Sequence, residues 1–435
     1  MDVRFNTVTL TRRSALGSLG ALAAVPRAAR AEPPSRIRHL AFSDMGGRPD
    51  GVQAMVSRRH LFVGHMFSNG FTVLDVADPR QPRPVKFISN GPNTRSHHLQ
   101  SVGDLLLVAN GADIPTLQRY NPSLNYYQQS FANGIKGIGD FAAGLRVYDI
   151  ANPAEPREIA FLNMPGIGIN RLWYAGGRYA WISAHLDGFT DHMLVVVDMQ
   201  EPTRPAIAGK WWMPGMWREG GETPTWKNRV ALHHMIVAGD KGFAAWRDGG
   251  FTILDLADPT KPKLLSHVNT APPYPGGTHT PLPLPGRGLA VVLDESTGFN
   301  CTKGLSYTWL YDVRDPSNPV SISSLPTPAD QAWCRAGENF GPHNLHENRP
   351  DTFRSEEIVF ATYHNAGLRV FDIRNAYAPV EIDRFIPPPP ARILDPRPGN
   401  ALAPQSCDIN VQPDGTMFLT DWNGGLNVLQ YDGLA

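Results

Sequence analysis

The sequence predicts an all-β fold built from a repeated unit, and three observations support this prediction. One phrase recurs along the chain, most clearly as GFTVLDVADPRQPRPV (70–85), GLRVYDIANPAEPREI (144–159) and GFTILDLADPTKPKLL (250–265). The 435 residues include 41 Gly and 40 Pro, which favours many short strands and turns over long helices. The Asp residues that end the core phrase are 49 to 74 residues apart, a spacing that suits a four-stranded unit with its loops: Asp75, Asp149, Asp198, Asp255, Asp312 and Asp372. With a truncated last copy at 425–433, seven copies predict a seven-bladed β-propeller.

Each copy is expected to form an alternating strand, a D-P-x-x-P turn and a short outer strand. Proline ends strand pairing, and the Asp before it caps the turn through its side chain, so both are interpreted as structural. Residues 36–43 (RIRHLAFS) are predicted to complete the blade that contains 425–433. The N- and C-terminal strands would then close the ring within one blade.

Residues 1–31 are predicted to be a signal peptide of the twin-arginine type. Arg12 and Arg13 precede a short Ala/Leu/Gly run, and Ala29-Arg30-Ala31 forms a small-x-small cleavage site. The run is too short to span a membrane, and an ordinary Sec signal is the alternative. Residues 32–435 are then a single propeller domain, periplasmic or secreted, with no integral membrane segment.

The charge balance excludes an obvious polyanionic partner. Without residues 1–31 the chain carries 35 basic and 39 acidic groups, so we expect no nucleic-acid partner. Three cysteines remain, Cys301, Cys334 and Cys407. Their spacing matches no zinc motif, and an oxidising compartment would allow one disulfide, whose pairing stays open.

The histidines are not scattered. Of 14, nine to eleven fall at the starts of innermost strands or the ends of second strands, which share one face of a propeller. Four of them start innermost strands in different blades and are predicted to bind one divalent transition metal (Zn, Mn, Fe or Cu): His98, His234, His279 and His343. His346 follows His343 by three residues, and strand alternation turns it away from this set. Four further residues near the same face are predicted to be catalytic: Arg171, Arg247, Glu295 and His364. The alternative is a purely structural role, in which these side chains are hydrogen-bonded polar groups that fill the mouth of the central channel.

Long loops are predicted to cover this face. The insertion at 111–143 carries Tyr120, Tyr126, Tyr127 and Phe131 and is interpreted as a lid over an organic ligand. The connector 211–228 contains four tryptophans, and 387–405 is rich in proline. Simple packing between blades is the alternative for these segments.

Through the recurring phrase, the chain resembles the LVIVD-repeat β-propeller family, and the resemblance covers nearly all of residues 32–435. The resemblance implies the fold and says little about chemistry. In outline only, the predicted histidine floor is similar to those of carotenoid oxygenases, selenium-binding-type thiol oxidases and oligogalacturonate-type lyases. The first hypothesis is therefore an exported, metal-dependent enzyme of lyase, hydrolase or oxidase type. It would act on a small organic substrate, such as a carboxylate or an aromatic compound. The alternative is a non-enzymatic periplasmic binding or assembly propeller that recognises a partner with the same face. The oligomeric state stays open.

Overall fold

The computed structural model describes residues 34–113, 139–328, 331–395 and 400–434. The chain divides into two units, Met1–Pro34 and Ser35–Ala435, and every strand named below lies in the second. The predicted signal peptide and residues 114–138 of the predicted lid lie outside the described residues. Across the described ranges, no helix is long and apolar enough to cross a membrane.

The repeated unit is an antiparallel meander of four strands. One sheet contains a single unit, in the order β2 (Gly51–Ser57), β3 (His60–His65), β4 (Gly70–Asp75) and β5 (Arg83–Ser89). Five of the six residues of β4 are buried, whereas β5 contains no buried residue. The apolar alternation of the recurring phrase therefore supplies the core, and the last strand of the unit forms the rim.

The other sheets each contain two such units. A nine-stranded sheet comprises β6 (Thr94–Arg95), β7 (Leu99–Val102), β8 (Leu105–Ala112), β9 (Gly144–Asp149), β10 (Arg157–Asn163), β11 (Gly168–Trp173), β12 (Tyr179–His185), β13 (Met193–Asp198) and β14 (Ala206–Trp211). An eight-stranded sheet comprises β15 (Val230–Ala238), β16 (Lys241–Arg247), β17 (Phe251–Asp255), β18 (Lys263–Val268), β19 (Thr278–Leu284), β20 (Leu289–Asp294), β21 (Thr308–Asp312) and β22 (Val320–Ser324). A second comprises β23 (Phe340–Leu345), β24 (Ile358–His364), β25 (Leu368–Asp372), β26 (Val380–Phe385), β27 (Ser406–Val411), β28 (Thr416–Asp421), β29 (Gly425–Tyr431) and β1 (Ile37–Ser43). Two short 3-10 helices, η1 (Pro285–Arg287) and η2 (Gln331–Arg335), lie in connections.

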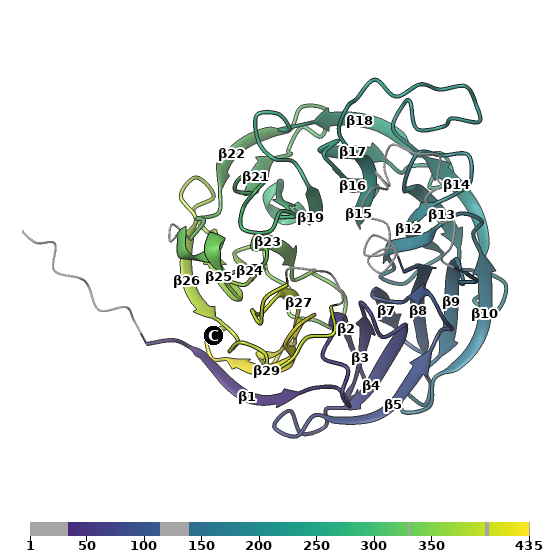
Figure 1. The fold of residues 1–435 in the computed structure, drawn as a ribbon. Helices are drawn as coiled ribbons and strands as arrows, with labels where there is room; N and C mark the ends of the chain where they lie inside the picture. The colour runs from purple at the N-terminus through teal and green to yellow at the C-terminus, as the bar shows by residue number, and fades with distance from the viewer. Residues whose placement is uncertain (1–33, 114–138, 329–330, 396–399, 435) are drawn as a thin grey trace, which may run out of the picture. The chain divides into compact units, whose positions relative to one another are not determined.

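Within the second unit the sheets are arranged radially about a common centre (Figure 1). Strands β15, β19, β23 and β27 lie nearest the centre, and β18, β22 and β26 lie on the rim. This radial arrangement of antiparallel sheets is a β-propeller. Strand β1 lies antiparallel to β29, with Ile37 opposite Tyr431 and Ser43 opposite Leu426.

The recurring Asp residues are structural, as the sequence predicted. Each accepts a hydrogen bond from the backbone N–H two residues ahead, at 2.9–3.1 Å, and so caps the turn that follows the strand: Asp75, Asp149, Asp198, Asp255, Asp312 and Asp372.

The joints between units explain why two classes of position share one face. The end of a second strand pairs with the start of the next innermost strand, as in Arg247 with Thr278 and His364 with Ser406. Side chains at these positions therefore come together although they belong to different repeats.

Candidate functional site

A cavity of about 580 Å³ opens on the face where second strands end and innermost strands begin. Its lining contains four histidines that lie within or directly before innermost strands of different repeats, His98, His233, His279 and His343. Arg247 and Glu295 lie on the same lining.

His279, His343 and Glu295 form the tightest group of possible metal ligands in this cavity. The Nε2 atom of His279 lies 3.6 Å from Glu295 Oε2, and the Nε2 atom of His343 lies 3.7 Å from Glu295 Oε1. One donor atom from each of the three residues lies within 4.8 Å of the others, and all three residues are buried. They come from β19, from β23 and from the residue that follows β20.

Hydrogen bonds show which nitrogen of each imidazole carries the proton. His343 Nδ1 lies 2.7 Å from the carbonyl oxygen of Cys407, which can only accept, so Nδ1 is the protonated nitrogen. His279 Nδ1 lies 2.8 Å from Thr280 Oγ1, whose own proton goes to Asn344 Oδ1 at 2.7 Å, so this Nδ1 also donates. Both Nε2 atoms therefore present lone pairs toward the Glu295 carboxylate.

His233 and His98 have the same tautomer. His233 Nδ1 lies 3.1 Å from the carbonyl oxygen of His279, and His98 Nδ1 lies 3.3 Å from Gln53 Oε1, which also accepts from the Leu99 N–H. The rings form a row, with centroid separations of 6.4 Å from His98 to His233, 3.6 Å from His233 to His279 and 4.8 Å from His279 to His343. His364 extends the row, 4.7 Å from His343.

Burial sets the charge of these groups. It lowers the pKa of His279 well below the usual range, and it lowers the pKa of His343 to about 4 although Glu295 acts in the opposite direction. Burial raises the pKa of Glu295, but the Arg247 guanidinium, with His343 and His364, outweighs it and lowers the pKa to about 2. At neutral pH the centre therefore offers two neutral imidazoles and a carboxylate, a donor set that suits a transition metal.

Arg247 and His364 close the centre from the ends of second strands. The Arg247 guanidinium forms an ion pair with Glu295, whose side chain is 10% exposed. Both residues have left-handed backbones, with φ of 52° at Arg247 and 40° at His364. Positive φ costs energy in residues with a side chain and is concentrated at functional sites.

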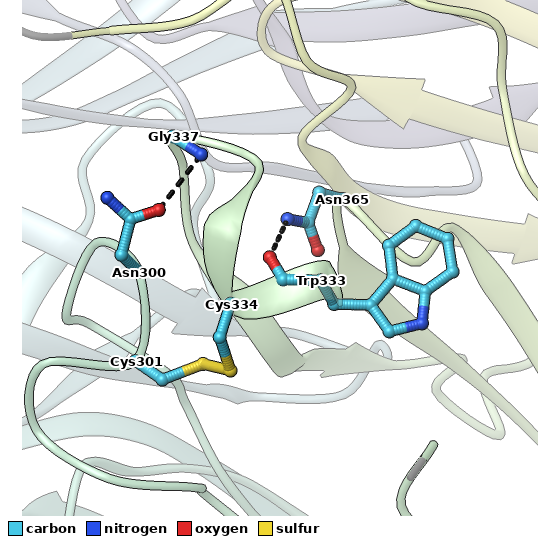
Figure 2. The surroundings of a disulfide bond; sticks show 6 residues. All are labelled: Asn300, Cys301, Trp333, Cys334, Gly337 and Asn365. Carbon is cyan, nitrogen blue, oxygen red and sulfur yellow. Dashed lines mark hydrogen bonds between the residues drawn. A yellow bond between two sulfur atoms is a disulfide. The ribbon is translucent and has the colours of Figure 1, made fainter. Parts of the chain in front are cut away.

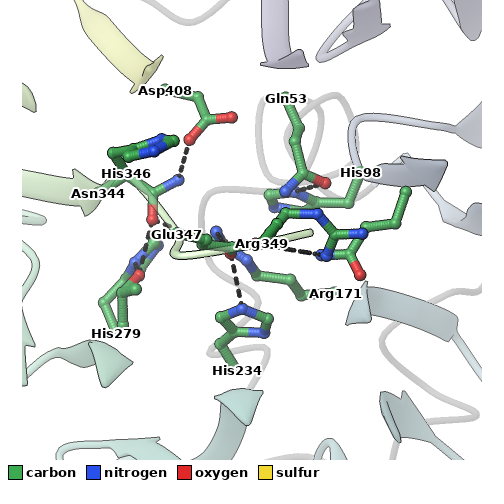
Figure 3. A network of polar contacts seen from close by, with 12 residues as sticks. Gln53, His98, Arg171, His234, His279, Asn344, His346, Glu347, Arg349 and Asp408 are labelled. Carbon is green, nitrogen blue, oxygen red and sulfur yellow. Dashed lines mark hydrogen bonds and ion pairs between the residues drawn. The ribbon is translucent and has the colours of Figure 1, made fainter. Parts of the chain in front are cut away.

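Two predicted site residues lie elsewhere. His234 Nε2 lies 2.8 Å from Glu347 Oε1, and the Arg171 guanidinium donates to the same oxygen at 2.8 Å (Figure 3). Neither residue lines the cavity. The structure thus brings together His279, His343, Glu295, Arg247 and His364, places His98 farther along the row, and separates His234 and Arg171 into a buried network around Glu347.

His346 also lies away from the row. Its ring nitrogens lie 3.3 Å from the carbonyl oxygen of Ile409 and 2.7 Å from that of Phe353. Strand alternation predicted this separation from His343. The residues that the sequence reasoning missed are His233 and Glu347. The adjacent residues His233 and His234 were both candidates for the cavity lining, and the sequence could not decide between them. The signal for Glu347 was its place in GPHNLHENRP, directly after His346.

A disulfide fixes one wall of the cavity. Cys301 and Cys334 are bonded, which joins the loop after β20 to η2 (Figure 2). Phe299 and Lys303, on either side of Cys301, line the cavity. Asn300 accepts a hydrogen bond from the Gly337 N–H at 2.9 Å and so holds the two segments together a second time. The remaining cysteine, Cys407, is a buried free thiol.

Comparisons with known proteins agree with the fold. The family model described as LVIVD repeat matches residues 138–163 and 235–270, which contain two of the clearest copies of the phrase. The chain is similar in structure to the β-propeller domain of Cps50 (Swd1) from Myceliophteria thermophila, at 12% identity and a TM-score of 0.52, over 88% of this chain and 97% of that one. It is also similar to the periplasmic gluconolactonase PpgL of Pseudomonas aeruginosa, at 13% identity and a TM-score of 0.54, over 86% of this chain and 96% of that one. A comparison with curated proteins gives no match.

Proposed function

We propose that this protein is a metal-dependent β-propeller enzyme that acts on a small organic anion. The observation that carries the proposal is the convergence of three electron-pair donors, His279 Nε2, His343 Nε2 and a Glu295 oxygen, within 4.8 Å of one another. The two Nε2 lone pairs face the negatively charged Glu295 carboxylate and repel it. A cation bound between the three groups would remove this repulsion, because all three would be its ligands.

His279, Glu295 and His343 would hold the metal, which can be Zn, Mn, Fe or Cu. When bound, the ion would supply Lewis acidity toward a carbonyl or phosphoryl oxygen, and copper or iron would also supply redox chemistry. The chain's own groups bind and orient the substrate. His98 and His233, which burial keeps neutral and whose Nδ1 atoms carry the proton, can accept hydrogen bonds at Nε2 from substrate hydroxyl groups. His364 packs behind His343.

The lining charge supports an anionic substrate. Five cationic side chains face three carboxylates on the lining: Arg95, Lys227, Arg229, Arg247 and Lys303 against Asp191, Asp248 and Glu295. A bound divalent ion would add to this positive excess, which attracts carboxylates. Trp226, Phe299 and Trp422 supply apolar wall against the carbon skeleton.

Hydrolysis, elimination and oxidation are all compatible with this donor set. The activity named for the Pseudomonas aeruginosa neighbour makes a lactone one candidate substrate, although the likeness at 13% identity is one of fold alone. The side chain of Arg171 does not reach the cavity lining. Its proposed role is therefore to hold Asn344 and Glu347 in the buried network, to both of which it donates hydrogen bonds.

The complete architecture is part of the proposal. We infer a ring of seven blades over residues 32–435, supported by the seven copies of the phrase and by the pairing of β1 with β29. Deletion of residues 425–435 should then lower the melting temperature sharply, because it leaves an unpaired blade edge. Residues 111–143 are proposed as a lid.

Export by the twin-arginine route to the periplasm or the medium is also proposed, on the arginine pair and the cleavage site at residues 29–31. Changing Arg12 and Arg13 to Lys should leave unprocessed precursor. Normal processing of that variant would instead indicate a Sec signal.

The proposed activity is tested by a substrate panel. Purified protein is incubated with lactones, carboxylate esters and unsaturated uronates, and with thiols or phenols under oxygen, before and after chelation and with added Zn²⁺, Mn²⁺, Fe²⁺ or Cu²⁺. The proposal predicts turnover that chelation abolishes and one metal restores. A protein that turns over no member of the panel with any of these metals, yet retains a specific macromolecular partner, would favour the binding or assembly alternative.

A further inference from the structure

We infer that Thr280 is a positioning residue of the metal centre, because its hydroxyl fixes the tautomer and the orientation of the His279 imidazole. This inference rests on the proposed function, since the value of the fixed tautomer lies in the Nε2 lone pair that it leaves toward Glu295. The group beyond Thr280 is a buried strut of four side chains, Asn344, Arg171, Glu347 and His234, defined here as the axial strut.

The direction of each hydrogen bond follows from groups that can act only as donors or only as acceptors. Arginine can only donate, so Asn344 Oδ1, which lies 3.0 Å from Arg171 Nη1, is an acceptor. The Asn344 amide nitrogen correspondingly donates to Asp408 Oδ1 at 2.7 Å. Thr280 Oγ1, 2.7 Å from the same Asn344 Oδ1, must therefore donate its proton there. Toward His279, Thr280 Oγ1 can therefore act only as an acceptor. Because Thr280 accepts, His279 Nδ1 must carry the proton.

The far end of the axial strut is held equally firmly. Arg171 binds Asn344 with one nitrogen and Glu347 with the other, and His234 donates to the same Glu347 oxygen (Figure 3). Arg171 and Asn344 are 0% exposed, and Thr280 is 0% exposed. Water therefore does not compete for these bonds, and the Asn344 oxygen cannot rotate away from Thr280 without leaving a buried guanidinium short of a partner.

The backbone explains how neighbouring residues can face one another. Successive side chains of a regular strand point to opposite faces, yet His279 and Thr280 are hydrogen-bonded. The pairing of β19 with β20 shifts register between Thr278 and Thr280, so His279 is an extra residue at a bulge. A bulge re-aims a side chain, and here it turns the imidazole so that one nitrogen meets Thr280 and the other faces Glu295.

The experiment compares Thr280→Val with Thr280→Ser. Valine has the shape of threonine without the hydroxyl, and serine restores the hydroxyl without the methyl group. A matched control is Thr72→Val, because Thr72 Oγ1 lies 2.7 Å from Nε2 of another fully buried histidine, His65, that does not line the cavity. Melting curves show how much each variant is destabilised.

The first measurement uses metal-free protein with ¹⁵N-labelled histidine, and the His279 signals are assigned by their loss in His279→Gln. Long-range ¹H–¹⁵N spectra should show His279 with the proton on Nδ1 in the wild type and in Thr280→Ser. Thr280→Val should show a shift toward the Nε2–H tautomer. An unchanged tautomer in Thr280→Val would overturn the inference, whether or not the protein binds a metal.

The second measurement is the affinity for Zn²⁺, determined by competition with a chromophoric chelator. Thr280→Val should bind about ten- to a hundredfold more weakly than the wild type, the loss typical of a group that orients a ligand. Thr280→Ser should restore most of the affinity, and Thr72→Val should bind as the wild type does despite a comparable fall in melting temperature. Equal weakening in Thr72→Val and Thr280→Val would contradict a positioning role. A wild type that binds no Zn²⁺ would count against the metal centre, while the tautomer spectra would still decide the role of Thr280.

Discussion

Arg247 forms a largely buried ion pair with Glu295 across the joint between two repeats, with side chains that are 14% and 10% exposed. Arg247 is the last residue of β16, and Glu295 follows the last residue of β20. The pair keeps a carboxylate ionised between two imidazoles that cannot donate protons to it. The guanidinium therefore compensates the same negative charge that a bound metal would compensate.

Replacing Arg247 by Met should destabilise the metal-free protein by about 3 kcal/mol, because it leaves the Glu295 carboxylate buried without its cation. The same concentration of Zn²⁺ should then raise the free energy of unfolding more in Arg247→Met than in the wild type, since the metal is now the principal compensating charge. Urea denaturation with and without Zn²⁺ measures both effects. Arg83→Met serves as the control, because its ion pair with Asp75 is exposed and such pairs contribute little. Equal stabilisation by Zn²⁺ in wild type and Arg247→Met would argue against Glu295 as a ligand.

Glu347→Gln should cost about 3–5 kcal/mol in the free energy of unfolding. Arg171, which is 0% exposed, would lose the negative charge of its partner, and His234 would donate its Nε2 proton to a neutral amide oxygen, a weaker acceptor than the carboxylate. Glu201→Gln removes an exposed partner of Arg204 and should change stability by less than about 1 kcal/mol. Chemical denaturation of the two variants distinguishes them, and a Glu347→Gln loss as small as that of Glu201→Gln would show that the axial strut is not structural.

The recurring phrase predicted the strands, the turns and the shared face of the histidines because these depend on local patterns. The capped turns at the recurring Asp residues and the β1–β29 pairing follow from alternation and from turn chemistry that any copy displays. The choice between His233 and His234 was different. Strand alternation distinguishes them only if the register is known, and the pairing of β15 with β16 shifts register between Val230 and His234.

The strands that carry the two histidines of the candidate metal centre also contain register shifts. Register shifts surround His279 in β19 and His343 in β23, so each imidazole leaves an innermost strand at a bulge. No residue type marks a bulge in the sequence. The position of Arg171 away from the cavity lining could not be predicted for a related reason, since its partner Glu347 lies 176 residues away and only the folded chain brings them together.

Asp408 should contribute a part of the stability that falls as the pH rises from about 4 to about 7, whereas the buried histidines, whose pKa values burial lowers, contribute in the opposite direction. Burial raises the pKa of Asp408 to about 7, although Arg171 acts in the opposite direction. The folded state therefore keeps a proton that the unfolded chain releases near pH 4, and this contribution is greatest at low pH and is lost as the pH passes 7. Asp408→Asn should remove about 2–4 kcal/mol of that decline. Urea denaturation of both proteins between pH 4.5 and 7.5 tests this, and parallel curves would contradict it.

The Cys301–Cys334 disulfide should stabilise the cavity wall. It closes a loop with a sequence separation of 33 residues, so replacing both cysteines by Ser should cost about 3–4 kcal/mol. Because Phe299 and Lys303 line the cavity beside Cys301, the double variant should also bind substrate or anionic inhibitors more weakly. Denaturation and ligand titration measure the two effects. A loss of stability with unchanged ligand affinity would show that the wall does not depend on the bond.

The metal content of the purified protein is the decisive test of the metal centre at His279, Glu295 and His343. Wild type, His343→Ala and His267→Ala are produced in metal-replete medium, dialysed, and measured by elemental analysis beside their melting curves. His267 is exposed and lies outside the cavity lining, so its variant should keep the wild-type content. We expect about one equivalent of a divalent transition metal in the wild type and its loss in His343→Ala, with the propeller still folded. A metal-free wild type, in which His343→Ala only lowers the melting temperature, would contradict it.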